Sequence, residues 1–212
     1  MNIYQVETEA LLFGNHVHLE PLDFRHVQGL ISAAAADISL YQWSPVPQGE
    51  EEVYKYIQTA LSWRDAGTAV PLAIIRVKDG AVIGSTRFFK IKKWAWPPDH
   101  PRYGHPFPDA CEIGYSWLTS SAIRTGSNTE AKLLLLKLAF EKWQVLRVCL
   151  HTDTRNTRSR IAIERIGGKF EGILRSHRLA IDQIPRDSAR FSIISSEWPD
   201  VKKILEKLLD RK

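Results

Sequence analysis

Arg124-Thr125-Gly126-Ser127-Asn128-Thr129-Glu130-Ala131 is the stretch of sequence from which the rest of the chain is interpreted. It joins a predicted strand over residues 112–118 to a predicted helix whose apolar run covers residues 133–140. A loop of small residues that opens a helix leaves backbone N–H groups unpaired and lies at the positive end of the helix dipole, which suits a phosphate group. We therefore interpret residues 124–131 as a candidate pyrophosphate site.

The same residue types are also ordinary loop and N-cap residues, so the stretch alone favours simple helix capping. It is not a nucleotide-binding P-loop, because no Gly-Lys-Ser/Thr closes it, and it lacks the three-glycine spacing of a dinucleotide fingerprint. The order of the neighbouring elements has to decide between capping and binding.

Length and composition predict one globular domain over residues 1–212, with 44% hydrophobic and 25% charged residues. No apolar run approaches the roughly 20 residues that cross a bilayer, and the first residues lack a basic segment followed by an apolar core. We therefore expect a cytoplasmic protein without a membrane partner. Cys111 and Cys149 fall in predicted strands and are expected to be buried, reduced thiols.

The charge distribution allows two interpretations. The net charge is +5, and the stretch from Arg147 to Arg178 is rich in arginine. Such a stretch is most often a solvated helix face, and it would steer an anionic cofactor as well as it would bind RNA. Nucleic acid therefore ranks third among the partner classes. No metal is expected, because His100 and His105 have no third ligand at a suitable spacing.

The first half of the chain predicts a strand, two helices and a hairpin. The strand covers residues 11–22, and the helices cover residues 24–35 and 50–63. Two β-rich runs, residues 70–77 and 81–91, are separated by Lys78-Asp79-Gly80, a strong hairpin signal. Between these elements, the irregular segment 41–47 is expected to line a cleft, and the proline-rich excursion 92–109 is expected to act as a lid.

The second half alternates strands and helices. Strands are predicted over residues 112–118, 146–152, 169–179 and 190–194, with a final helix over residues 197–209. A further helix begins after Asn156 and stops at Gly167-Gly168. The order predicts an α/β (α+β mixed sheet) fold of about seven strands with helices on both faces.

This order and three motifs resemble the GNAT superfamily of acyl-CoA-dependent N-acetyltransferases, and in particular its ribosomal-protein N-terminal acetyltransferase-like branch. The motifs are Glu112-Ile113-Gly114-Tyr115-Ser116-Trp117-Leu118, Gly126-Ser127-Asn128-Thr129-Glu130-Ala131, and Asn156-Thr157-Arg158-Ser159 before Ile166-Gly167-Gly168. The resemblance covers nearly the whole chain. One departure is Asn128, which stands where the family has a glycine; asparagine tolerates positive φ better than most residues.

The resemblance implies acetyl-CoA as co-substrate, with its pantetheine arm inserted between the strands at 112–118 and 146–152. Backbone groups of the first strand would pair with the arm, and N–H groups of residues 125–130 would hold the pyrophosphate. Arg124 either adds a charge or is a surface residue, and Asn156 either caps its helix or reaches the cofactor. The implied cofactor-binding residues are Trp117, Leu118, Thr119, Arg124, Thr125, Gly126, Ser127, Asn128, Thr129, Glu130 (through its N–H) and Asn156.

The implied chemistry is direct attack of a primary amine on the thioester, with an acid and a base. Glu112 is the expected base, although a strand-end carboxylate can also be a plain surface group. Ser159 matches the family position of the acid, where packing on a helix surface is an equal alternative. His151 and Asp153 lie near the same cleft. No covalent acyl-enzyme is expected, because the chain lacks Gly-x-Ser-x-Gly.

The sequence does not identify the acceptor, which is either a protein N-terminus or an amine-bearing small molecule. A rival interpretation is a non-catalytic sensor that binds acyl-CoA on the same scaffold. Substrate choice is expected in the segments 41–47 and 94–108, and the second of these can equally bury itself against a twin subunit in a homodimer.

Overall fold

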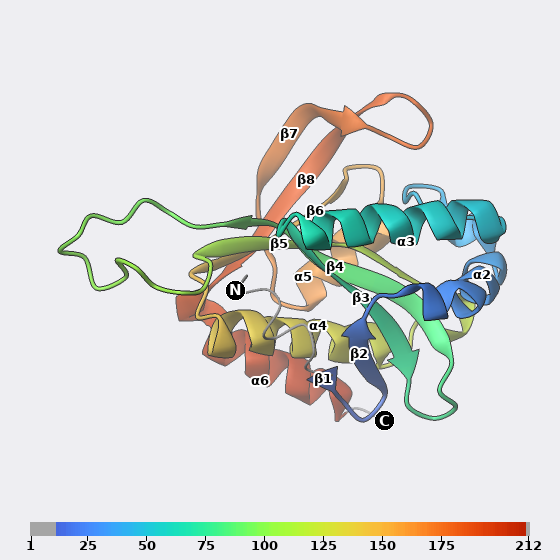
Figure 1. Cartoon of the computed structure of the whole chain (residues 1–212), viewed down its shortest axis with the longest axis horizontal. Coiled ribbons are helices and arrows are strands. Elements are labelled where there is room, and N and C mark those ends of the chain that lie inside the picture. The colour runs from blue at the N-terminus through green and yellow to red at the C-terminus, as the bar shows by residue number, and fades with distance from the viewer. Residues whose placement is uncertain (1–11, 211–212) are drawn as a thin grey trace.

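The computed structural model describes residues 12–210, which form a single mixed sheet of eight strands with helices on both faces (Figure 1). The sheet order is β1-β2-β3-β4-β5-β6-β8-β7, and β5 and β6 form its parallel pair. The strands are β1 (Leu12–Phe13), β2 (Val17–Pro21), β3 (Ala69–Arg76), β4 (Val82–Lys92), β5 (Ala110–Leu118), β6 (Arg147–Asp153), β7 (Lys169–Leu179) and β8 (Pro185–Ile194).

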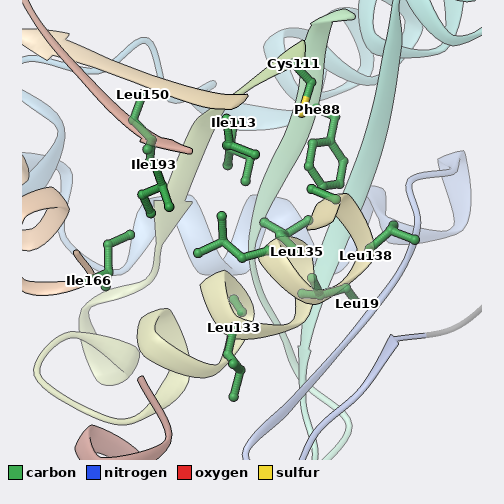
Figure 2. Close-up of a cluster of buried hydrophobic side chains, with 14 of the residues drawn as sticks. Leu19, Phe88, Cys111, Ile113, Leu133, Leu135, Leu138, Leu150, Ile166 and Ile193 are labelled. Carbon is green, nitrogen blue, oxygen red and sulfur yellow. The ribbon is translucent and has the colours of Figure 1, made fainter. Parts of the chain in front are cut away.

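The helices divide between the two faces of the sheet. One face is covered by α2 (Val27–Ala35) and α3 (Gly49–Asp65), which enclose a smaller core with Ala73, Ile75 and Trp117. The other face is covered by α4 (Ser127–Lys137), α5 (Thr157–Arg165) and α6 (Trp198–Leu209), which bury the larger core. Figure 2 shows Leu135 of α4 facing the strand residues Phe88 and Ile113 of this larger core. As predicted, α4 is largely buried.

Most predicted elements are confirmed, and the differences lie at their ends. The predicted strand 11–22 is interrupted by a turn and becomes β1 and β2, which gives eight strands instead of about seven; Leu11 lies outside the described residues. Strand β8 begins earlier than predicted, at Pro185. Short 3-10 turns are added at η1 (Phe24–His26), η2 (Ile38–Tyr41), η3 (Ser120–Ala122) and η5 (Ser195–Glu197), and a π-helical turn, η4 (Leu138–Lys142), extends α4.

The seam between β5 and β6 is short. Only three residue pairs align, the last of them Glu112 with Cys149, and both strands continue beyond that point. The backbone groups that would have paired across the seam are therefore available to a ligand that runs between the strands. The two cysteines of this seam are free thiols; Cys111 is buried as expected, and Cys149 is half-buried.

A β-bulge interrupts β5 just beyond the seam. Arg87 of β4 aligns with Gly114 and Ser85 aligns with Trp117, so that Tyr115 and Ser116 oppose the single residue between them on β4. Tyr115 adopts a positive φ of 51°. A bulge turns local backbone groups out of the ladder and re-aims side chains, and it is common beside active sites. The Glu112 and Tyr115 side chains both lie on the α3 face, whereas Ser116 contacts α4.

The excursion after β4 extends away from the rest of the protein, at the left of Figure 1. Its base is fastened by Asp109, whose carboxylate accepts hydrogen bonds from the Trp94 backbone, the Trp96 indole and Arg102. These contacts hold the pKa of Asp109 below its ordinary value in spite of the opposing effect of burial. The loop is thus anchored at its root and is not folded over the sheet.

Candidate active site

A cavity of about 690 Å³ lies where β5 and β6 separate. Its walls come from β5, β6, the head of α4, the first turns of α5 and the β7–β8 hairpin, together with Tyr41, Trp43, Pro45 and Val46 from the segment before α3. The prediction that residues 41–47 line a cleft is therefore confirmed. The expectations that residues 92–109 act as a lid and that residues 94–108 select the substrate are not supported, because none of these residues lines this cavity.

The head of α4 offers backbone donors, although fewer than the sequence suggested. The Glu130 N–H donates to the Gly126 carbonyl, and the Ser127 N–H lies 3.2 Å from Thr125 Oγ1. These two amides are therefore engaged within the protein. Among residues 12–210, the N–H groups of Thr125, Gly126, Asn128 and Thr129 have no hydrogen-bond acceptor. Four amides at a helix N-terminus still make a suitable anion site.

The left-handed residue of this loop is Arg124, not Asn128. Arg124 has φ of 60°, whereas Asn128 lies within the first turn of α4, which begins at Ser127. The tolerance of asparagine for positive φ is therefore not needed at position 128, because the helix begins one residue before it. The side chains of Thr125 and Asn128 line the cavity, and so does that of the exposed Arg124.

Glu130 has a structural side chain, as predicted. Its carboxylate accepts backbone N–H groups from Asn15, His16 and Val17 at 2.6–2.8 Å, and it is almost completely buried. The turn between β1 and β2 is thereby fastened to the head of α4. A side chain at Gly126 would meet the His16 ring at 3.0 Å, so Gly126 allows close packing of that turn and does not line the cavity itself.

Strand β5 presents a different set of backbone groups from the predicted one. The Thr119 N–H donates to the Ile83 carbonyl and is occupied. Because backbone groups alternate in direction along a strand, Trp117 also turns toward β4, and Leu118 faces the open side. The Leu118 carbonyl accepts a hydrogen bond from the Tyr41 hydroxyl at 3.0 Å. The Leu118 N–H therefore remains a candidate contact, whereas the predicted backbone roles of Trp117 and Thr119 are not supported.

Asn156 and Ser159 meet at the start of α5. Asn156 Oδ1 accepts the Ser159 N–H at 3.0 Å, which is the capping alternative considered for this residue. Both residues line the cavity. The Asn156 amide nitrogen and the Ser159 hydroxyl thus remain free to meet a ligand, while the cap itself has a structural role.

The cavity is strongly cationic. One carboxylate, Glu112, contributes to its walls, against six cationic side chains: Arg124, Lys132, Arg158, Arg165, Arg178 and Arg186. Clustered like charges disfavour the empty protein and attract an anionic ligand. The basic stretch of the sequence is therefore directed, in part, into this cavity.

Glu112 lines the cavity, close to a histidine and two cationic side chains. Its carboxylate is 2.9 Å from His151 Nδ1, 3.2 Å from Lys90 Nζ and 3.5 Å from Arg178 Nη2. Burial pushes the pKa of Glu112 upward, but His151 and Lys90 outweigh it and hold the pKa below its ordinary value. Glu112 is therefore ionised and lies within ion-pair distance of His151. Asp153, by contrast, pairs with Arg155 and does not line the cavity.

A second cavity, of about 570 Å³, adjoins the first on the α3 face. Phe89, Tyr115 and Arg178 line both cavities. The ring of His177 borders the second cavity, and burial lowers the pKa of this histidine. The seam cavity and an aromatic-walled cavity thus meet at the β-bulge, on the side to which Glu112 points.

Lys132 is the functional candidate that sequence reasoning missed. It lines the seam cavity, it is only 6% exposed, and its Nζ is 2.5 Å from Ser116 Oγ at the bulge. One signal was available: a lysine four residues after Asn128 follows it on the same face of a helix that is otherwise rich in leucine. The contact with Ser116 depends on the bulge, which the sequence does not reveal.

Neither a metal cluster nor a membrane helix occurs in the described part of the chain. Residues 12–210 bring no three His, Cys, Asp or Glu side chains together as a metal site. No helix within that range has the length and apolar character needed to cross a bilayer. The metal-independent reaction expected from the sequence stays a prediction.

Comparison with known proteins identifies the family. Residues 16–169 match the Acetyltransferase (GNAT) domain, and the chain belongs to this family. A GCN5-related N-acetyltransferase from Brucella melitensis superposes with a TM-score of 0.81 at 26% identity, covering 96% of this chain and 86% of its own. A candidate acetyltransferase from T. thermophilus has a TM-score of 0.75 at 31% identity, covering 94% of this chain and 96% of its own. No curated protein matches the chain.

The predicted branch also has structural neighbours. Mycobacterium smegmatis RimJ, solved with CoA-disulfide, has a TM-score of 0.73 at 21% identity and covers 91% of this chain and 88% of its own. A candidate ribosomal-protein-serine acetyltransferase from Vibrio cholerae has a TM-score of 0.71 at 17% identity, covering 88% and 98%. These two neighbours are consistent with the predicted branch, and at such identities they bear on the fold alone.

Glu130→Ala should destabilise the protein by about 2–4 kcal/mol, because three backbone N–H groups lose a charged acceptor. Urea unfolding followed by circular dichroism measures the change. Glu164→Ala, at an exposed position of α5, serves as the control and should cost less than about 0.5 kcal/mol. Equal effects of the two substitutions would show that the Glu130 contacts do not hold the head of α4.

Proposed function

We propose that the protein transfers an acetyl group from acetyl-CoA to a primary amine by direct attack in a ternary complex. The observation that carries this proposal is the seam, where β5 and β6 separate into a cationic cavity beside an amide-rich helix start. A linear ligand with an anionic end and an amide-containing arm suits that shape and charge. Family membership supports the transferase class.

The residues present fit the pyrophosphate and the pantetheine arm of acetyl-CoA. The free N–H groups of residues 125, 126, 128 and 129 are suited to the pyrophosphate, and Arg124, Arg158 and Arg165 add positive charge. The arm would run along β5 toward the bulge, where the Leu118 N–H faces the cavity. Asn156 contributes an amide nitrogen beside the arm.

In the proposed complex, the thioester would lie at the bulge, beside backbone donors and the Glu112 and His151 side chains. A backbone N–H released from the ladder at Tyr115 and Ser116 can donate to the carbonyl oxygen as negative charge develops there. On the α3 face, Glu112 orients His151, and this pair takes the proton of the attacking amine directly or through water. A carboxylate whose pKa lies below its ordinary value is a weak base by itself, which favours the pair over Glu112 alone.

The acceptor amine is placed in the second cavity, whose walls include Trp63, Phe89 and Tyr115. A peptide N-terminus and a small amine both remain candidates for the acceptor. Ser159 lines the seam cavity and is the proton donor that the family resemblance suggests. A hydroxyl is a weak acid, so the leaving thiolate calls for a stronger donor. A cytoplasmic location, a single domain and a homodimer remain predictions from the sequence.

The proposed reaction predicts CoA release that requires both acetyl-CoA and an amine. Free thiol is measured during incubation with a panel of small amines and short peptides. In Glu112→Gln, kcat should fall about 100-fold, because His151 loses the carboxylate that assists it as a base. The Kd for acetyl-CoA should change less than about threefold. Glu171→Gln is the control, since this carboxylate of β7 pairs with Arg147 of β6 and does not line the cavity.

The outcome separates the enzyme from its rival. An acyl-CoA sensor would bind acetyl-CoA in calorimetry and release no thiol with any acceptor. Unchanged turnover in Glu112→Gln would remove Glu112 from the reaction and leave the transferase class intact.

Asn128→Asp should weaken acetyl-CoA binding at least tenfold without destabilising the free protein. The added charge repels the pyrophosphate, whereas a carboxylate in the first turn of a helix is favourable by about 0.3–1 kcal/mol. Calorimetry gives the affinity, and thermal unfolding gives the stability. Gln58→Glu, on the exposed side of α3, should leave both unchanged. Unaltered affinity in Asn128→Asp would place the phosphates elsewhere.

A further inference from the structure

Lys132 is a buried amine at the centre of the seam cavity. It lies one turn beyond Asn128 on α4, and both side chains line the cavity. Its Nζ lies 2.5 Å from Ser116 Oγ, which in turn lies 2.7 Å from Thr86 Oγ1. The lysine is therefore fixed by hydroxyl groups at the bulge, beneath the path along β5.

The charged groups of the surrounding elements are turned away from this amine or share its sign. Glu130 of the same helix is engaged by the β1–β2 turn, and Lys137 pairs with Glu206 of α6. Arg165 of α5 donates to Thr129, and Arg124 lies at the loop. Within residues 12–210, no carboxylate forms an ion pair with Lys132. Burial alone lowers its pKa to about 7, so the amine can gain or lose a proton near neutrality.

Lys132 lies on the opposite face of the sheet from Glu112 and His151, the two side chains proposed to accept the proton of the amine. Cys111 and Ile113 point into the core beneath α4, and Glu112, between them, points to the opposite face with His151. Beyond the bulge, Ser116 points to the α4 face and contacts Lys132. The amine-side base and Lys132 therefore flank β5 from opposite faces, with the bulge between them.

We propose that Lys132 is the general acid that protonates the sulfur of the departing CoA, a role that rests on the acetyl transfer proposed above. A thioester lying in the seam beside the bulge has its carbonyl carbon exposed toward the α3 face and its sulfur toward Lys132. A structural role alone would be better filled by an apolar side chain, because an unpaired buried ammonium destabilises the fold. Retaining a lysine here is consistent with a use for its proton.

Acetyl transfer forms one bond, breaks another and moves two protons. The amine nitrogen forms a bond to the carbonyl carbon, and the carbon–sulfur bond breaks with its electron pair on sulfur. The Lys132 ammonium gives one proton to that sulfur, yielding CoA thiol and a neutral lysine. The proton of the new amide nitrogen leaves through His151 and Glu112 on the other face. Lys132 regains its proton from solvent after the products depart.

The acidity of the group suits this transfer. An alkyl thiol such as cysteine has a pKa of about 8.5. An ammonium with a pKa of about 7 therefore gives its proton to the thiolate downhill. The ammonium must be present before the step, so the contribution of Lys132 is full below its pKa and is lost as the pH rises through it.

The test compares Lys132→Met, which keeps the length and the apolar packing, with the wild type from about pH 6 to 9. At about pH 6, kcat should fall about 100-fold in Lys132→Met. The ratio of wild-type to variant kcat should then shrink toward one as the pH rises, because the wild type loses its ammonium. The acceptor amine and the Glu112 and His151 side chains impose the same pH dependence on both proteins. The ratio of the two kcat values cancels it.

Two further variants separate proton donation from charge and from packing. Lys132→Arg keeps a cation that cannot give up its proton, so kcat should fall at about pH 6 as it does in Lys132→Met, and the ratio of wild-type to Lys132→Arg kcat should shrink in the same way as the pH rises. Lys137→Met removes a partly exposed lysine of the same helix and should leave kcat unchanged. Calorimetry with acetyl-CoA and thermal unfolding confirm that each variant folds and binds.

Each outcome decides the proposal. A Lys132→Met to wild-type ratio that is constant with pH, or a kcat equal to the wild type, would overturn the role of Lys132 while leaving acetyl transfer in place. Wild-type protein that binds acetyl-CoA but releases no thiol with any acceptor would overturn both the transfer and the acid. A pH-dependent ratio, with acetyl-CoA affinity within about threefold, supports Lys132 as the acid.

Discussion

Strands β5 and β6 hold each other at three residue pairs and then separate, and the cavity exists because the sheet hydrogen bonds are missing beyond Glu112 and Cys149. An interrupted ladder in the middle of a sheet leaves polar backbone groups that need partners. The bulge at Tyr115 and Ser116 falls just beyond the last pair and directs side chains to both faces. The proposed reaction uses this opening: the co-substrate completes the sheet and its thioester lies at the bulge.

The rest of the fold keeps that opening in place. Cores on both faces hold β5 against β4, and close approach is required at Gly84, where an added Cβ would lie 2.0 Å from the Trp117 carbonyl oxygen. The head of α4 is fixed independently, through the three backbone contacts of Glu130. Six cations on the cavity walls face one carboxylate, so the empty protein carries repulsion that a ligand with phosphate groups would relieve.

The sequence predicted the order of elements well because hairpin, capping and glycine-stop signals are local. Lys78-Asp79-Gly80, Asn156 and Gly167-Gly168 each fulfilled the expected role. The predictions that were wrong depended on contacts between distant segments. Thr119 was assigned to the co-substrate, but its N–H donates to the Ile83 carbonyl.

In the candidate site, too, the sequence predicted what depends on local signals and missed what depends on contacts between distant segments. Glu112 could be selected from its place at the start of a strand, whereas its contact with His151 requires the parallel pairing of β5 and β6. Lys132 has no local motif, since its environment is created by a bulge on another element. The 92–109 excursion was expected to act as a lid because of its length, and length carries no information about the direction in which a loop extends.

Backbone amide NMR during titration with CoA tests most directly whether the head of α4 and the open edge of β5 form the binding site. We predict that the largest shift changes occur at Thr125, Gly126, Asn128, Thr129 and Leu118, with small changes at Ser127 and Glu130, whose amides are already bonded within the protein. Saturable binding whose largest changes lie away from the seam would contradict the proposed site.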